Sequence, residues 1–113
     1  MRYTECRTVK DKQRFAIDYH GIECQQRKLV EEVHELNEAI TKYETMMKAG
    51  TPISSDCILT EVADVQNILG QIQMKYCLDN IEVNKEKTKK IERHFTEMVR
   101  EIEHLKNGLL SDN

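Results

Sequence analysis

The sequence predicts an all-α fold: a helical bundle of three long helices plus a short N-terminal helix. Of the 113 residues only one is Pro and four are Gly, whereas 33% are charged and 39% are hydrophobic. A chain so poor in Pro and Gly and so rich in charge favours long helices over a sandwich or barrel. Apolar residues also recur at alternating steps of four and three, which is typical of helices that pack lengthwise. We expect one domain over residues 1–113.

The N-terminal half is expected to contain a short helix and a long one. Residues 1–9 are expected to be a loose arm, because no periodic apolar pattern begins there. A short helix follows over about residues 10–20, and Gly21 permits a bend after it. From residue 22 to about 47 the sequence has neither Gly nor Pro, which predicts the first long helix.

The second long helix is expected after the only clear loop signal in the chain. Residues 49–52, with the sequence Ala-Gly-Thr-Pro, end the preceding helix. Ser54 or Ser55 is a candidate N-cap for the helix that follows, because a hydroxyl can accept a hydrogen bond from a free amide of the first turn. We expect this helix to run to about Leu78.

The third long helix is expected in the C-terminal part of the chain. Asp79 or Asn84 can cap its start, and it is predicted to end at about Asn107. Gly108 is expected to stop the helix, because glycine is favoured at helix C-termini. Residues 108–113 are then expected to be a frayed tail.

Each long helix carries one apolar stripe that steps four, three, four, three and four residues. The stripes are Leu29, Val33, Leu36, Ile40, Tyr43 and Met47; Ile58, Val62, Val65, Leu69, Ile72 and Tyr76; and Ile91, Phe95, Met98, Ile102, Leu105 and Leu109. Three amphipathic helices of this size leave apolar edges uncovered. We therefore expect a homodimer or homotetramer whose assembly completes a four-helix-type core.

Two carboxylate pairs have matching positions relative to these stripes. Glu32 and Glu35 lie three and six residues after the start of the first stripe, and Glu61 and Asp64 lie three and six residues after the start of the second. Both pairs should therefore flank the apolar seam on the same side. If the helices are antiparallel, the four carboxylates meet at one level, where they repel each other unless a cation neutralises them. Oxygen ligands of this kind suit Mg²⁺ or Mn²⁺.

The acidic residues also form a motif found in a known family. Glu31-Glu32-x-x-Glu35 is followed, after 25 residues, by Glu61-x-x-Asp64. With its surroundings, over about residues 20–95, this pattern resembles the MazG-like nucleotide pyrophosphohydrolases of the all-α NTP pyrophosphatase superfamily. That superfamily also includes dimeric dUTPases and phosphoribosyl-ATP pyrophosphatases.

The resemblance implies Mg²⁺-dependent hydrolysis of a nucleoside triphosphate to the monophosphate and pyrophosphate, by attack of water on the α-phosphorus. Carried over by position, Glu32, Glu35, Glu61 and Asp64 hold the metal. Glu35 is also a candidate to accept the proton of the attacking water. Glu31 is given a supporting role, either orienting a ligand or making a water-mediated contact.

Other residues are candidates for holding the nucleotide. Lys87 falls on the line of the third stripe, Lys90 on its flank and Arg93 nearby, so this basic run is predicted to bind phosphate. A solvated basic face is the alternative for this run.

Gln25 lies where an apolar stripe residue is the default, so it can bind a base or sugar or simply form the polar end of the seam. Lys28 is expected to pair with Glu32.

Two other functions are compatible with parts of the pattern. A non-catalytic helical oligomerisation or interaction protein fits the three stripes, and only the carboxylate pairs argue against it. A di-iron bundle needs two inward-facing Glu-x-x-His motifs. The string occurs at Glu31 and at Glu101, but His34 should lie on the outer face of its helix.

Composition also bears on location and partners. No segment has the length and apolarity of a membrane span, and the first residues lack the apolar region of a secretory signal. We therefore expect a cytoplasmic protein whose four cysteines are reduced thiols. The net charge of −3, with acidic and basic residues intermixed, argues against nucleic acid as a partner.

Overall fold

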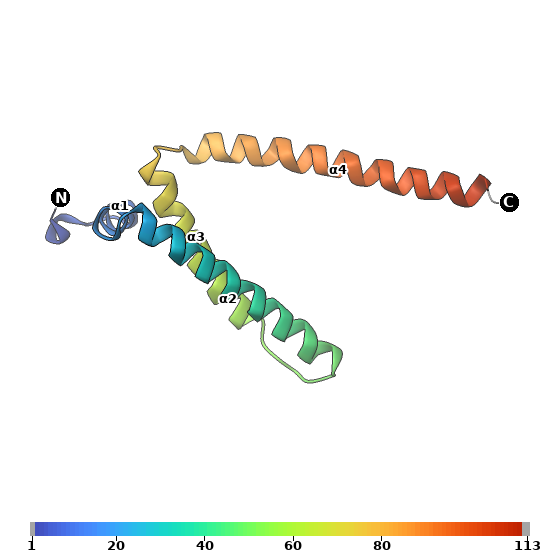
Figure 1. The fold of residues 1–113 in the computed structure, drawn as a ribbon, viewed down its shortest axis with the longest axis horizontal. Helices are drawn as coiled ribbons and strands as arrows, with labels where there is room; N and C mark the ends of the chain where they lie inside the picture. Colours follow the sequence, from blue (N-terminus) through green and yellow to red (C-terminus); the bar gives the residue numbers. More distant parts are fainter. Residues whose placement is uncertain (1, 112–113) are drawn as a thin grey trace. The chain divides into compact units, whose positions relative to one another are not determined.

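In the computed structural model, residues 2–111 are described, and this part of the chain is helical without any strand (Figure 1). The elements are a 3₁₀ turn, η1 (Tyr3–Glu5), and four α-helices: α1 (Val9–His20), α2 (Ile22–Lys48), α3 (Asp56–Lys75) and α4 (Asn80–Ser111). The predicted all-α fold, with one short and three long helices, is confirmed. None of these helices combines the length and the apolar character that crossing a membrane requires.

The start of the chain is more ordered than the loose arm that was predicted. Thr8 is the N-cap of α1, because its hydroxyl accepts a hydrogen bond of 3.0 Å from the amide of Asp11. In return, the Asp11 carboxylate accepts hydrogen bonds of 3.2 Å from the amides of Arg7 and Thr8. This reciprocal capping box satisfies amides that a helix start leaves without partners. Together with η1, it replaces the expected loose arm over residues 2–9, and residue 1 lies outside the described part.

The turns between the helices follow from glycine and serine positions. Gly21 has a φ of 83°, and its amide donates to the carbonyl of Ile17, so α1 ends and α2 begins there. Gly50 also has a positive φ, of 76°, directly after α2. Of the two predicted serines, Ser55 is the N-cap residue of α3, but its side chain makes no capping hydrogen bond. The hydroxyl of Ser54 instead accepts a hydrogen bond of 3.1 Å from the amide of Asp56.

The described residues belong to two compact units, Met1–Cys77 and Leu78–Asn113. The expectation that residues 1–113 act as a single domain stays a prediction. In the first unit, α2 and α3 lie side by side and run in opposite directions, and α1 packs against both (Figure 1). Ile17 of α1 and Ile68 of α3 are the buried apolar side chains of this unit.

The seam between α2 and α3 is rotated relative to the predicted apolar stripe. Val33, Ile40 and Met47 were expected to face the core, but their side chains are exposed. Gln25 and Glu32 are buried instead, with 4% and 6% of their surface exposed. Gln25 lies on the line of the predicted stripe, whereas Glu32 lies one position before Val33. Because neighbouring helical positions differ by roughly 100°, the observed packing turns Glu32 into the seam in place of Val33.

The helix α4 extends through the glycine that was expected to stop it. It runs from Asn80 to Ser111, so Gly108 lies inside the helix and residues 108–111 are not a frayed tail. A helical glycine costs only about 1 kcal/mol relative to alanine, which the rest of a long helix can offset. Residues 112–113 of the predicted tail lie outside the described part. At the other end, Asp79 rather than Asn84 supports the start, because its carboxylate accepts a hydrogen bond of 2.7 Å from the amide of Ile81.

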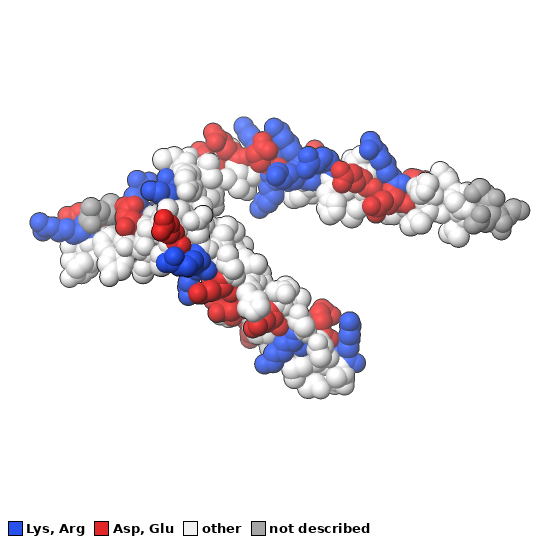
Figure 2. All heavy atoms as spheres, in the orientation of Figure 1, with Lys and Arg blue, Asp and Glu red and all other residues white. Residues whose placement is uncertain are grey.

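The surface of α4 is divided into apolar and charged parts. Lys and Arg side chains gather along its first half, as Figure 2 shows. Exposed apolar side chains follow the predicted third stripe, and they are Ile91, Phe95, Met98, Ile102, Leu105 and Leu109. The helix is therefore strongly amphipathic.

Candidate metal centre

Three of the four predicted metal ligands come together between α2 and α3. Glu32 projects from α2, and Glu61 and Asp64 project from successive turns of α3. One carboxylate oxygen from each of these residues lies within 4.8 Å of the others. The three residues, which we call the carboxylate layer, meet because α2 and α3 are antiparallel. The predicted convergence of the two acidic motifs is therefore confirmed for these three residues.

The carboxylate layer is partly enclosed and partly open. Glu32 is buried, Glu61 is half-buried and Asp64 is exposed. The Oε2 atoms of both Glu32 and Glu61 are buried and have no hydrogen-bond partner in the described part of the protein. Buried polar atoms normally have partners, and an ionised carboxylate is costly to bury without one. These two oxygens fit a hard divalent cation, which takes carboxylate oxygens as ligands.

Lys28 supplies one positive charge to this group. Its ammonium lies 3.1 Å from Oε1 of Glu32, as predicted for residues four apart on a helix. The hydrogen bond to Glu32, followed by the charge of Glu32, raises the pKa of Lys28 above its ordinary value of 10.5. Lys28 therefore remains charged at neutral pH, but it contacts the other oxygen of Glu32 and leaves Oε2 without a partner.

Glu35, the fourth predicted ligand, lies beside the carboxylate layer. The negative charge of Glu32 raises the pKa of Glu35 above its ordinary value of 4.5, with smaller contributions from desolvation and from the charge of Glu61. Glu35 and Glu61 also line one open hollow of about 420 Å³, together with Lys42 and Cys57. Glu35 is thus electrostatically coupled to the layer, and its roles as a ligand and as a proton acceptor stay predictions.

Glu31 and His34, which lie within the acidic segment of α2, are both outside the carboxylate layer. Glu31 is exposed, and its supporting role stays a prediction. His34 is also exposed, and its Nε2 atom lies 2.8 Å from the carboxylate of Glu38. A di-iron site requires its histidines to face the bundle interior, so the position of His34 argues against that alternative.

A second polar layer lies beside the carboxylates in the same seam. Gln25 of α2 and Gln71 of α3 are each only 4% exposed, and the side-chain amide of Gln25 donates a hydrogen bond to the carbonyl oxygen of Gln71. We call this pair the amide layer. Gln71 also donates to Asn67 at 3.4 Å, and Gln13 of α1 donates to the same oxygen at 3.5 Å. The predicted contact of Gln25 with a base or sugar stays a prediction.

Sequence reasoning missed Gln71 and Asn67. The signal for Gln71 was its position seven residues after Asp64, which mirrors the position of Gln25 seven residues before Glu32. Residues seven apart lie at nearly the same angle on a helix. Asn67 had no comparable signal, because it is exposed and acts only through its contacts with Gln71 and Gln13.

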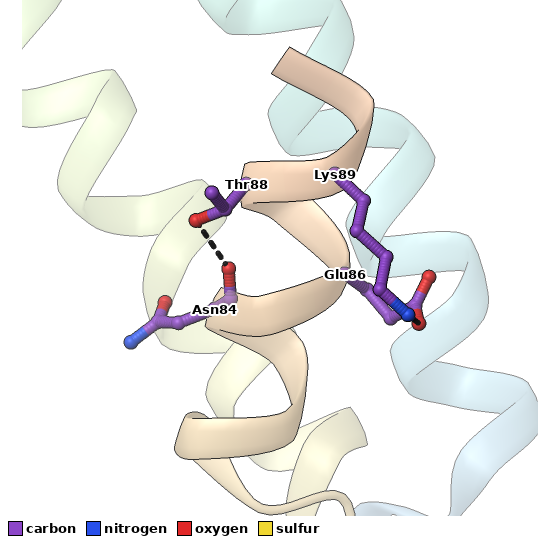
Figure 3. Close-up of polar contacts among 4 residues, drawn as sticks. All are labelled: Asn84, Glu86, Thr88 and Lys89. Carbon is purple, nitrogen blue, oxygen red and sulfur yellow. Dashed lines mark hydrogen bonds and ion pairs between the residues drawn. The ribbon is translucent and has the colours of Figure 1, made fainter. Parts of the chain in front are cut away.

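The predicted phosphate-binding residues are on α4, in the second unit. Lys87, Lys90 and Arg93 are exposed there. Within the same run, Lys89 forms an ion pair of 3.4 Å with Glu86, and the hydroxyl of Thr88 donates to the carbonyl of Asn84 (Figure 3). The binding of phosphate by Lys87, Lys90 and Arg93 stays a prediction.

Comparisons of the chain with protein-family models, with curated proteins and with solved structures found no match. None of the four cysteines forms a disulfide within the described residues, and Cys57 lines the hollow beside the carboxylate layer.

Proposed function

We propose that the protein is a divalent-metal-dependent nucleoside triphosphate pyrophosphohydrolase that releases pyrophosphate and a nucleoside monophosphate. The observation that carries this proposal is the carboxylate layer, in which two buried oxygens, Oε2 of Glu32 and Oε2 of Glu61, have no partner among the described residues. The resemblance of residues 20–95 to MazG-like pyrophosphohydrolases agrees with this chemistry.

In the proposed site, Glu32, Glu61 and Asp64 hold Mg²⁺ or Mn²⁺, with Glu35 as a further ligand. Such an ion neutralises phosphate charge and lowers the pKa of the attacking water. The three residues are suited to this role because they converge from two helices, and because Asp64 leaves one side of the layer open to a substrate. Lys28 offsets part of the negative charge of Glu32 without occupying both of its oxygens.

Proton transfer in the proposed reaction falls to Glu35. A carboxylate oxygen of Glu35 that does not bind the ion accepts the proton of the attacking water. Glu35 also faces the hollow that it shares with Glu61, where a water molecule has room to approach. Glu31 supports the ligands from the exposed side of α2, and Lys87, Lys90 and Arg93 of α4 bind phosphate.

The proposed assembly is a homodimer or homotetramer in which a four-helix-type core forms between protomers. Val33, Ile40 and Met47 form an exposed row on α2 at intervals of seven residues, and α4 carries its own exposed apolar stripe. Burial of such rows against a second copy removes apolar surface from water. We also propose that the protein acts in the cytoplasm, without a nucleic-acid partner.

The apolar stripe of α4 also favours a second candidate function, that of a non-catalytic helical interaction protein. The two functions differ in their response to metal and nucleotide. If the protein is a pyrophosphohydrolase, millimolar Mg²⁺ raises its thermal midpoint and supports pyrophosphate release from members of a nucleoside triphosphate panel. If it is only an interaction protein, Mg²⁺ has neither effect.

The decisive activity experiment uses this panel with mono- and diphosphate controls and the variants Glu32→Gln and Glu44→Gln. Glu44 is an exposed glutamate on the same helix, so its variant controls for the loss of one charge from α2. We expect Glu32→Gln to abolish pyrophosphate release and Glu44→Gln to retain it. Equal activity of both variants and the wild-type protein would contradict the proposal.

A further inference from the structure

We infer that the amide layer, Gln25 with Gln71, is a register lock that aligns α2 with α3 so that Glu32 lies opposite Asp64. In this role both glutamines are positioning residues for the carboxylate layer. The consequence for metal binding rests on the proposed function, whereas the consequence for helix register does not.

The two layers are related by one heptad along both helices. Glu32 lies seven residues after Gln25 on α2, and Asp64 lies seven residues before Gln71 on the antiparallel α3. The next step of seven in the same directions leads to Ala39 and Cys57, which line one hollow together. Three successive levels of the seam therefore share one register, and the amide layer is the level whose members bond directly to each other.

The carboxylate layer cannot set this register by itself. The native alignment brings Glu32, Glu61 and Asp64 together, with Lys28 as the only cation paired with them in the described part of the chain. Like charges at such short separations repel. Without a bound cation, the alignment that builds the site is therefore electrostatically unfavourable, and another contact must hold it.

The connection between the helices is also too long to set the register. Seven residues, 49–55, join α2 to α3, and a segment of this length can extend to about 25 Å. A slip of one heptad moves one helix along the other by only about 10 Å. The connection thus tolerates the slipped alignments.

A buried amide pair is able to set the register because its hydrogen bond is directional. In an alignment shifted by one heptad, Gln25 and Gln71 no longer face each other, and their direct hydrogen bond is lost. One of the two amides then lies opposite a carboxylate, either Gln71 opposite Glu32 or Gln25 opposite Asp64, and the other amide loses its partner. Leaving a buried polar group without a partner is costly, whereas apolar layers exchange neighbours more freely. A single buried amide position is known to specify register in coiled coils.

The test replaces both glutamines by methionine, which has a similar volume but no amide. Gln25→Met/Gln71→Met removes the lock without leaving either partner alone. The matched control is Gln26→Met/Gln66→Met, because these two glutamines are exposed on the same helices. All proteins compared are full-length chains in which Cys57 is the only native cysteine retained.

Disulfide formation with Cys57 reports the register directly. A second cysteine is placed either at Ala39→Cys, which matches the native alignment, or at Met46→Cys, which matches a slip of one heptad. In proteins with the wild-type seam and in the control, we expect the disulfide with Cys57 to form at least about tenfold faster for Ala39→Cys than for Met46→Cys. In the Gln25→Met/Gln71→Met protein we expect this preference to disappear, while circular dichroism still shows a helical chain.

Binding of Mn²⁺, measured by calorimetry on the same proteins without the added cysteines, tests the consequence for the site. Loss of an outer partner of a metal site typically weakens metal affinity by about 10–100-fold, and we expect a loss in this range only in the Gln25→Met/Gln71→Met protein. If this variant does not fold, Gln25→Leu/Gln71→Leu takes its place in the same measurements.

The outcomes separate the inference from the proposed function. If the preference for Ala39→Cys survives without the amides, the register lock is wrong. If the register changes but the Mn²⁺ affinity does not, the link between the lock and the site is wrong. If the wild-type protein binds no Mn²⁺, the proposed function fails, and the cross-linking result alone decides whether the lock exists.

Discussion

The amide layer and the carboxylate layer occupy equivalent places in one seam, yet they differ in how their polar atoms are satisfied. Gln25 and Gln71 bond to each other, and Gln71 also bonds to Asn67. In the carboxylate layer, Oε2 of Glu32 and Oε2 of Glu61 have no hydrogen-bond partner within the described residues. Both layers are polar, but only the carboxylate layer has buried oxygens that are left without a partner among the described residues.

This difference shows why polarity in a helix seam does not by itself identify a functional site. A buried polar group whose hydrogen bonds are complete within the protein can serve specificity of folding alone. A buried charge with an unpartnered oxygen is unfavourable unless a cation completes it. The comparison therefore supports the inferred structural role of the amides and the proposed ligand-binding role of the carboxylates.

The largest effect on activity and Mn²⁺ affinity is expected when a carboxylate of the carboxylate layer is replaced by the corresponding amide. Glu32→Gln and Asp64→Asn each remove one negative charge, and each should lower pyrophosphate release and Mn²⁺ affinity by at least about 100-fold, the upper end of what loss of an outer partner costs. Without metal, Glu32→Gln should raise the thermal midpoint, because it removes repulsion with Glu35 and Glu61.

The matched control for this prediction is Glu44→Gln, on the same helix but outside both layers. We expect it to keep both the activity and the rise in thermal midpoint that Mg²⁺ produces. Full activity in both Glu32→Gln and Asp64→Asn would remove the proposed mechanism.

A smaller effect is expected when the amide layer is only half removed. Gln71→Leu leaves the buried amide of Gln25 without its partner, which should lower the free energy of unfolding by about 1–3 kcal/mol. Adding Gln25→Leu should recover part of this loss, and urea denaturation of the four proteins in this double-mutant cycle measures it. If the two single losses simply add, the amides do not act as a pair.

The cap of α1 provides a comparison outside both layers. Thr8→Ala removes the hydroxyl that accepts from the amide of Asp11 and should lower the free energy of unfolding by about 1 kcal/mol, without changing Mn²⁺ affinity. Thermal denaturation and calorimetry measure the two quantities. A change in Mn²⁺ affinity would show that the cap and the metal centre are coupled.

The same cap predicts a pH dependence. Hydrogen bonds from the amides of Arg7 and Thr8 lower the pKa of Asp11 below its ordinary value of 3.8. The ionised Asp11 therefore stabilises the folded state above pH 3.8, and this contribution disappears as the pH falls through the lowered pKa. The stability difference between the wild-type protein and Asp11→Asn should be constant near neutral pH and shrink only below pH 3.8. A difference that shrinks between pH 7 and pH 5 would contradict this assignment.

The smallest effect is expected at the edge of the amide layer. A Cβ atom on Gly70 would lie 2.6 Å from the side-chain amide nitrogen of Gln13, so Gly70→Ala should displace this flexible side chain and break its long contact with Asn67. Because alanine is favoured over glycine in helices by up to about 1 kcal/mol, the net change should be a slight gain in stability. A clear loss in urea denaturation would show that Gln13 is essential to the layer.

The helices were largely predictable because their signals are local. Steps of four and three placed the three long helices, and Gly21 and Gly50 correctly marked the ends of the first two helices. The end of α4 was not predictable from Gly108, because one glycine costs a long helix little. The order of the first residues depends on the capping box of Thr8 with Asp11, which an apolar pattern does not reveal.

The site was predictable where two motifs shared an offset. Glu32, Glu61 and Asp64 converge because matched positions on antiparallel helices meet. The burial of Glu32 was not predictable, since the stripe placed Val33 and Ile40 in the seam, and only the packing of α2 on α3 decides which neighbouring position turns inward. The partner of Gln25 was missed for the same reason.

The most direct test of the carboxylate layer is anomalous diffraction from crystals of the full chain grown with Mn²⁺. The ion should appear as one anomalous peak bound by carboxylate oxygens of Glu32, Glu61 and Asp64, with metal–oxygen distances of roughly 2.0–2.4 Å, and the peak should be absent in crystals of Glu32→Gln. The absence of a peak between these three residues in the wild-type protein, at a Mn²⁺ concentration that supports pyrophosphate release, would contradict the account.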